Sequence, residues 1–116
     1  MVTFERVATL LLALGLAGCA SISEMRRGEP AFSASTSKSS QQVSRCILSG
    51  WQEKSARYGD VYLQPLGEGF SVLSAGNVEV ADITPIASGT DIKFYHKSGI
   101  FSYRTDARVD VIKHCI

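Results

Sequence analysis

An apolar run near the N-terminus ends at a cysteine and is too short to cross a membrane. Residues 7–17 are eleven apolar or small residues, preceded by a short head that carries Arg6. A transmembrane helix needs about 20 apolar residues. A shorter run with a charged head and a small-residue cleavage site is typical of a secretory signal peptide. We therefore predict that residues 1–18 are removed and take no part in the fold.

The four residues at the end of this run, Leu16-Ala17-Gly18-Cys19, resemble the lipobox of bacterial lipoproteins. The resemblance implies that Cys19 Sγ receives a diacylglycerol, that cleavage follows Gly18, and that the new amino terminus is acylated. Two or more acyl chains hold a protein stably at a membrane, whereas one gives only marginal affinity. By the sorting pattern of such lipoproteins in Gram-negative bacteria, Ala20 in place of Asp implies the outer membrane, with the domain facing the periplasm.

The mature chain of 98 residues is long enough for one small domain. Its basic and acidic residues nearly balance and alternate along the sequence. A nucleic-acid-binding domain normally carries a basic stripe and a high pI. The composition therefore argues against a nucleic-acid partner.

Two cysteines remain in the mature chain once Cys19 is committed to lipid: Cys46 and Cys115. An exported protein enters an oxidising compartment, so an even number of remaining cysteines favours a disulfide. Free thiols are the first alternative. A metal site is the second, with His114 as an extra ligand, but the C-x-x-C spacing of zinc sites is absent. We predict a Cys46–Cys115 disulfide.

Residues 19–38 are predicted to be the lipidated cysteine followed by a flexible tether. The segment is rich in serine and has no sustained apolar period. Such a composition buries too little apolar surface to offset the entropy of ordering it. The folded domain is accordingly expected over residues 39–116.

A helix is predicted over residues 40–55. Ser39-Ser40-Gln41-Gln42 has the form of a capping box, which satisfies free backbone donors at a helix start. The apolar residues that follow recur at i, i+3, i+4 and i+8, the spacing of one helical face: Val43, Cys46, Ile47 and Trp51. Trp51 is interpreted as a core residue rather than a ligand platform.

From Asp60 onward the apolar period changes to two, which is typical of strands. Strands are expected in "DVYLQPL", "FSVLSA", "VEVADITPI", "DIKFYH" and "IFSYR", separated by turns rich in Gly, Asn and Ser. The last stretch, residues 105–116, fits a short helix or a strand. The predicted fold class is α+β. An N-terminal amphipathic helix packs on an antiparallel meander of four to five strands, and a disulfide pins the C-terminal helix or strand.

No catalytic, metal-binding or cofactor-binding set is predicted. His96 and His114 are the only histidines, and neither lies in a metal-binding motif. No serine lies in a nucleophile elbow. Asp106 and Asp110 alternate with arginines, which fits local ion pairs better than acid catalysis.

One aromatic stretch, "KFYHKSGIFSYR", is the candidate partner-binding surface. On two paired strands, Tyr95 and Tyr103 would be more exposed than Phe94 and Phe101, and tyrosine and arginine are favoured at protein interfaces. The candidate binding residues are Tyr95, Tyr103 and Arg104. Cross-strand pairing that only stabilises a hairpin is the alternative.

The expected function is that of a membrane-anchored lipoprotein with a non-catalytic binding or scaffold role. The expected partner is an envelope protein or a cell-wall component. Inhibition of a cell-wall hydrolase of the lysozyme type is the alternative.

Overall fold

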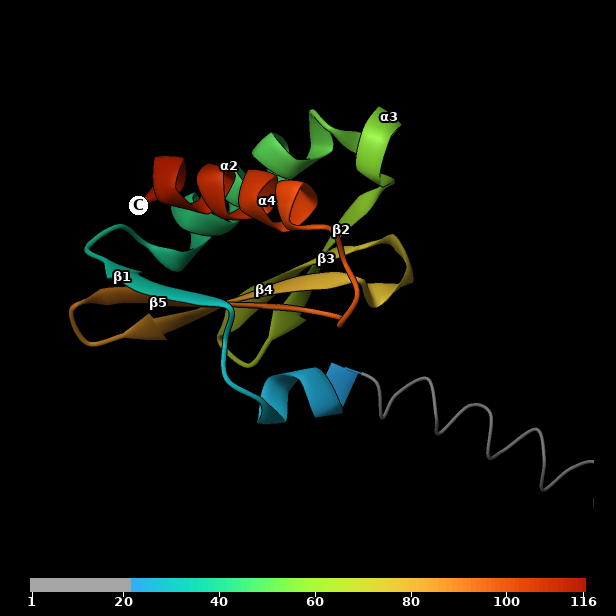
Figure 1. Ribbon diagram of the computed structural model, residues 1–116. Coiled ribbons are helices and arrows are strands. Elements are labelled where there is room, and N and C mark those ends of the chain that lie inside the picture. The colour runs from blue at the N-terminus through green and yellow to red at the C-terminus, as the bar shows by residue number, and fades with distance from the viewer. Residues whose placement is uncertain (1–21) are drawn as a thin grey trace, which may run out of the picture.

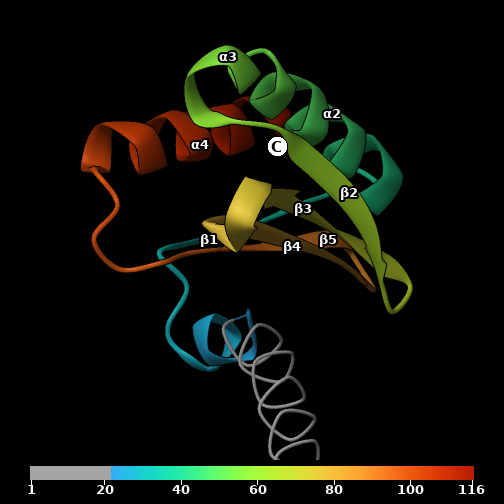
Figure 2. The same cartoon turned by 90° about the vertical axis from the view of Figure 1, so that its right-hand side faces the viewer.

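A five-stranded antiparallel sheet forms the middle layer of the protein (Figure 1). The computed structural model describes residues 22–116, so the predicted signal peptide and Cys19 lie outside the described residues. Three helices lie on one side of the sheet, and a helical segment, residues 22–27, lies on the other side (Figures 1 and 2). The elements are β1 (Phe32–Thr36), α2 (Ser40–Gln52), α3 (Ser55–Tyr58), β2 (Val61–Leu66), β3 (Gly69–Ser74), the 3-10 turn η1 (Ala75–Asn77), β4 (Glu79–Ile86), β5 (Gly89–His96) and α4 (Ser102–Cys115).

The strand order across the sheet is β1-β5-β4-β3-β2. β2 to β5 follow one another as a meander, which confirms the α+β class and the antiparallel meander predicted from the alternating sequence. The fifth strand is β1, which pairs with β5 so that Phe32 lies opposite Phe94. The sequence predicts the fifth strand at residues 100–104 instead, and that prediction is wrong.

The core lies between the sheet and the helical layer. Across the sheet, Val72, Ala81 and Phe94 lie in one row of paired positions, and all three are fully buried. α2 lies where the sequence predicts a helix over residues 40–55, and Ser39 Oγ caps it by accepting from the backbone N–H of Gln42. Trp51 is a core residue as predicted and meets Phe94 edge to face, with ring centroids 6.0 Å apart. Such pairs add about 0.5–1.5 kcal/mol beyond the area they bury.

The prediction of a flexible tether over residues 19–38 is wrong for residues 22–27, which are helical, and for the part that forms β1. Phe32, Ala34 and Thr36 are half-buried, whereas Ser33 and Ser35 are exposed. Burial along β1 therefore alternates with a period of two. The sequence does not show this alternation clearly because the segment is rich in serine. The backbone of β1 is ordered by its ladder with β5. The domain therefore begins before Ser39, and α2 is not its first element.

The last helix, α4, resolves the choice left open for residues 105–116 and begins earlier than that stretch, at Ser102. Its buried face carries Thr105, Arg108, Ile112 and Cys115. An arginine at a buried position breaks the apolar period that would reveal a helix. This is why residues 105–116 fit a strand as well as a helix in the sequence.

The predicted disulfide between Cys46 and Cys115 is present, with the two Cα atoms 5.7 Å apart. It joins the middle of α2 to the end of α4. Cys115 is buried, but Cys46 is exposed and lies beside the inward face of α2 rather than on it. At Gly50 a Cβ atom would come within 2.5 Å of a methyl carbon of Val111. The two helices therefore approach closely where α2 has no side chain.

Candidate functional site

The three candidate binding residues do not form one surface. Tyr95 lies on β5 and is only 7% exposed. Tyr103 and Arg104 lie in the first turn of α4 and line a different cavity from Tyr95. The predicted hairpin is wrong because its second strand is helical, so alternation cannot place Tyr95 and Tyr103 on a common face.

Tyr103 instead pairs with Phe101, which the sequence predicts to be the less exposed of the two. Phe101 is 71% exposed and Tyr103 is 56% exposed. Their rings are stacked, with centroids 5.6 Å apart and an interplanar angle of 13°. The predicted order of exposure is therefore wrong for Phe101. Two large rings stacked in solvent form a flat apolar platform at the start of α4.

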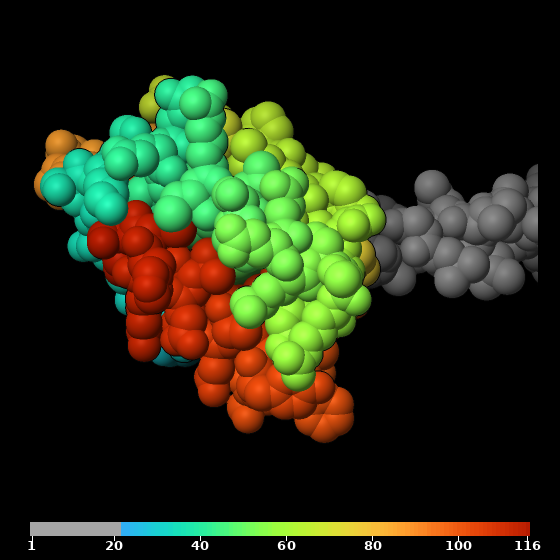
Figure 3. Space-filling model, turned by 90° about the horizontal axis from the view of Figure 1, so that it is seen from above, coloured from blue at the N-terminus to red at the C-terminus, as the bar shows by residue number. Residues whose placement is uncertain are grey.

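The platform borders a cavity of about 310 Å³. We call this site the aromatic corner: Arg57, Tyr58, Phe101, Tyr103 and Arg104. Seen from above the helical layer, the end of the α2–α3 region and the start of α4 meet at this corner (Figure 3). The corner thus joins two segments that are far apart in sequence.

Arg57 is an exposed arginine of the aromatic corner. Its guanidinium carbon lies 5.3 Å from the ring centroid of Tyr58 and 5.5 Å from that of Tyr103. Arg57 takes part in none of the ion pairs found within residues 22–116. Cation–π contacts at exposed sites contribute about 0.5–1 kcal/mol. The two ring contacts hold the guanidinium of Arg57 beside the platform. Its N–H groups have no carboxylate partner among residues 22–116.

A charge cluster of Glu79, Arg104 and Arg108 connects the aromatic corner to the interior of the protein. Glu79 is fully buried at the start of β4, and its Oε1 accepts from Nε and Nη2 of Arg104 at 3.0 and 2.8 Å and from Nε of Arg108 at 3.3 Å. Arg104 Nη2 also donates to the carbonyl oxygen of Tyr58 at 3.2 Å. These bonds tie α4 to both β4 and α3, and so they fix the position of the corner.

Arg108 lies deepest in this cluster. Its guanidinium carbon lies 4.8 Å from the ring centroid of Trp51, and its Nη1 donates to the carbonyl oxygen of that residue at 3.3 Å. Burial lowers the pKa of Arg108 from the ordinary arginine value, and the carboxylate of Glu79 opposes that shift. Within the described residues, Glu79 Oε2 and Arg108 Nη2 are buried without a hydrogen-bond partner.

The aromatic corner has the chemistry of a binding site. The residues that line its cavity carry no histidine, thiol or carboxylate that could act as a base or nucleophile. Rings and a guanidinium supply stacking, apolar contact and bidentate hydrogen bonds to an anion. Sequence reasoning found Tyr103 and Arg104 but missed Arg57, whose role depends on a contact across the fold.

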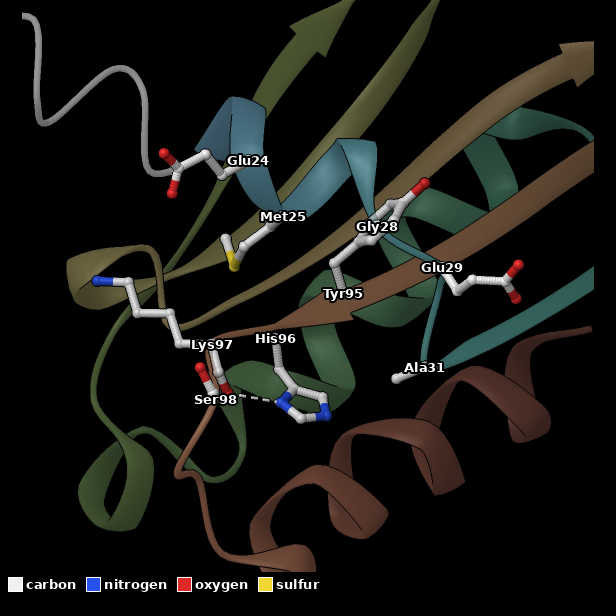
Figure 4. Close-up of a pocket in the computed structure, with 9 residues that line it drawn as sticks. All are labelled: Glu24, Met25, Gly28, Glu29, Ala31, Tyr95, His96, Lys97 and Ser98. Atoms are coloured by element: carbon white, nitrogen blue, oxygen red, sulfur yellow. Dashed lines mark hydrogen bonds between the residues drawn. The ribbon is translucent and has the colours of Figure 1, made fainter.

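Two further cavities lie elsewhere. One, of about 640 Å³, lies between the 22–27 segment and the end of β5, and Tyr95 lines it (Figure 4). The Nδ1 atom of His96 lies 2.7 Å from the carbonyl oxygen of Lys97 there. The other, of about 540 Å³, is a groove between α2 and α4 beside the disulfide. His114 lines that groove, and its Nδ1 lies 3.2 Å from the carbonyl oxygen of Asp110. Both histidine rings thus contact backbone close by in sequence.

Comparison with protein-family models, curated proteins and solved structures found no match for this chain. Over residues 22–116, no helix is long and apolar enough to cross a membrane. Within the same range, no group of three or more His, Cys, Asp or Glu residues is placed to hold a metal ion.

Proposed function

We propose that this protein is a lipid-anchored binding module of the cell envelope that holds its partner at the aromatic corner. The lipobox-like residues Leu16 to Cys19 support the anchor, and Ala20 supports sorting to the outer membrane. The Cys46–Cys115 disulfide is consistent with an oxidising compartment such as the periplasm. The role is non-catalytic, and the partner is an envelope protein or a cell-wall component.

The observation that carries the binding role is the solvent-exposed stack of Phe101 and Tyr103 beside Arg57. Aromatic residues and arginine dominate the energetics of interfaces because they bury a large area with few rotatable bonds. The buried cluster beneath the stack holds the backbone of α4 in place. The platform is therefore arranged before a partner arrives, which lowers the entropy cost of binding.

A photocrosslinking experiment in cells tests this proposal. A photoreactive amino acid at position 103 should give a discrete crosslinked product, and the Phe101→Ala variant should weaken it. Tyr62 on β2 is the matched control, because it is a similarly exposed tyrosine outside the corner. Equal crosslinking from positions 62 and 103, or none from 103, would contradict the proposal.

The identity of the crosslinked partner separates the two roles considered for this domain. A structural envelope protein or a wall fragment supports a scaffold module. A lysozyme-type hydrolase whose turnover falls in the complex supports an inhibitor. In the second case Tyr103→Ala should restore turnover, whereas Tyr62→Ala should leave the inhibition unchanged.

A further inference from the structure

The 22–27 segment is fastened to the face of the sheet opposite the helical layer. Arg26 donates to both carboxylate oxygens of Asp82 on β4, from Nε at 2.9 Å and from Nη2 at 3.0 Å. Nη2 also donates to Ser71 Oγ at 3.1 Å, and Ser71 in turn donates to Asp82 Oδ1 at 2.6 Å. The Asp82 side chain is mostly buried. A bidentate pair of this kind fixes orientation as well as position.

This attachment leaves very little chain between the domain and the predicted lipid. Two residues separate Cys19 from Ile22, the first described residue of the helical segment. Three extended residue steps reach only about 10 Å, at roughly 3.5 Å per residue. If the chain were free up to β1, the thirteen steps to Phe32 would reach about 45 Å. The contacts of Arg26 therefore decide how far the domain can move from its anchor.

We propose that the membrane is the partner of this face: the lipid on Cys19 holds the 22–27 segment and the adjoining outer face of the sheet against the headgroup layer. This inference rests on the proposed anchor. The distance available, about 10 Å, is too short for the domain to turn its helical layer toward the bilayer while Arg26 stays bound. The domain is thus oriented and not merely tethered.

The charges on this face indicate that the lipid on Cys19, and not the protein surface, supplies the affinity for the membrane. Glu24 and Glu29 line the cavity beside the segment together with Lys97 (Figure 4), and Arg27 is an exposed residue of the segment. Lys93 and Asp91 of β5 lie on the same face of the sheet, because they pair with Asp82 and Thr84. A basic side chain near an anionic leaflet is attracted to it, and acidic neighbours offset this attraction. The unlipidated domain should therefore not bind vesicles.

The orientation places the aromatic corner away from the bilayer. The start of α4 and the short helix α3 lie in the helical layer, across the sheet from the 22–27 segment (Figures 1 and 2). A partner bound there approaches from the aqueous side of the membrane.

The test uses the full lipidated protein in vesicles of phosphatidylethanolamine and phosphatidylglycerol that carry a headgroup-attached paramagnetic quencher. A fluorescent amino acid replaces either Ser98, beside the 22–27 segment, or Ser49, on the helical layer; both positions are exposed. We expect several-fold stronger quenching at position 98 than at position 49. Equal quenching at the two positions in the acylated protein overturns the docked orientation.

Two variants test the cause of the orientation. A long Gly/Ser insertion between residues 21 and 22 lengthens the tether without touching the fold, and it should remove the difference in quenching. Arg26→Ala should reduce the difference as well, whereas Arg45→Ala, at an exposed arginine of α2, should not. A difference that survives the insertion overturns the inference.

Mass spectrometry of the same sample separates the two proposals. An unmodified Cys19 overturns the anchor itself, whereas equal quenching with an acylated Cys19 overturns only the docking.

Discussion

Arg104 donates two hydrogen bonds to a single carboxylate oxygen of Glu79, and these bonds fasten the first turn of α4 to the first residue of β4. Arg108, one turn further along the helix, donates a hydrogen bond to the same oxygen. One fully buried carboxylate thus accepts hydrogen bonds from two guanidinium groups. The position of the aromatic corner depends on a charge cluster inside the fold.

We expect Glu79→Gln to lower the free energy of unfolding by about 3–5 kcal/mol, because the change leaves the charge of Arg108 buried without a counter-ion. Urea denaturation followed by tryptophan fluorescence measures this loss. Asp106→Asn, at an exposed acid on the same helix, is the control and should change the stability by less than about 0.5 kcal/mol. A loss below about 1 kcal/mol for Glu79→Gln would show that the cluster does not hold α4 in place.

The disulfide should contribute a large share of the stability of so small a domain. Cys46→Ala and Cys115→Ala should each lower the free energy of unfolding by about 2–5 kcal/mol. The double variant should be little worse than either single one, since both remove the same bond. Cys115→Ala should be the more costly single change, because Cys115 is buried and Cys46 is exposed. Free thiols in peptides from protein isolated under non-reducing conditions would contradict this pairing.

Thermal melts of four alanine variants distinguish the core from the corner. Phe94→Ala should cost about 3–5 kcal/mol because the ring is fully buried against Trp51. Tyr95→Ala should also destabilise the fold. Phe101→Ala and Tyr103→Ala should each change the stability by less than about 1 kcal/mol, since exposed substitutions are usually small. Early melting of the Phe101 variant would show that the stack is structural.

The anchor can be checked directly. Mass spectrometry of the mature amino terminus should find an acylated Cys19, because acyl transfer to this thiol is what the lipobox-like tetrad implies. Cys19→Ser should leave an unprocessed precursor without lipid. Cys46→Ser is the control, and its amino terminus should be acylated normally. A peptidase cut elsewhere with Cys19 unmodified would rule out this form of anchoring.

The meander was predictable because each of its strands alternates apolar and polar residues next to a turn rich in Gly, Asn or Ser. The strand β1 was not, because Ala34 and Thr36 are weak apolar signals on its inward face and the serines between them resemble a linker. Sequence composition reports how much apolar surface a segment carries. It does not report whether a neighbouring strand offers a free edge for backbone pairing.

The aromatic corner was predictable only in part, for a related reason. Periodicity treats a buried position as apolar, but α4 buries Arg108 against Glu79, a residue 29 positions earlier. A pairing over that distance leaves no local signal. Once residues 100–104 resemble a strand, Phe101 is assigned to the core and Arg57 has no visible partner. The first error comes from the local alternation of residues 100–104, and the second from the contact of Arg57 with Tyr103, which are far apart in the sequence.

The disulfide also determines how the domain responds to tension. Cys46 and Cys115 close the chain between them into a loop, so a pull applied at Cys19 and at Ile116 can straighten the N-terminal side only as far as Cys46. From Cys19 that length is 27 residue steps, or about 95 Å when fully stretched. The contacts of Arg26 and then the ladder of β1 with β5 lie first along this path. Drag on a partner at the proposed site is therefore resisted first by elements that can re-form. Beyond Cys46 the load divides between two arms of the closed loop, one toward Arg57 and the other, through the disulfide, toward Tyr103.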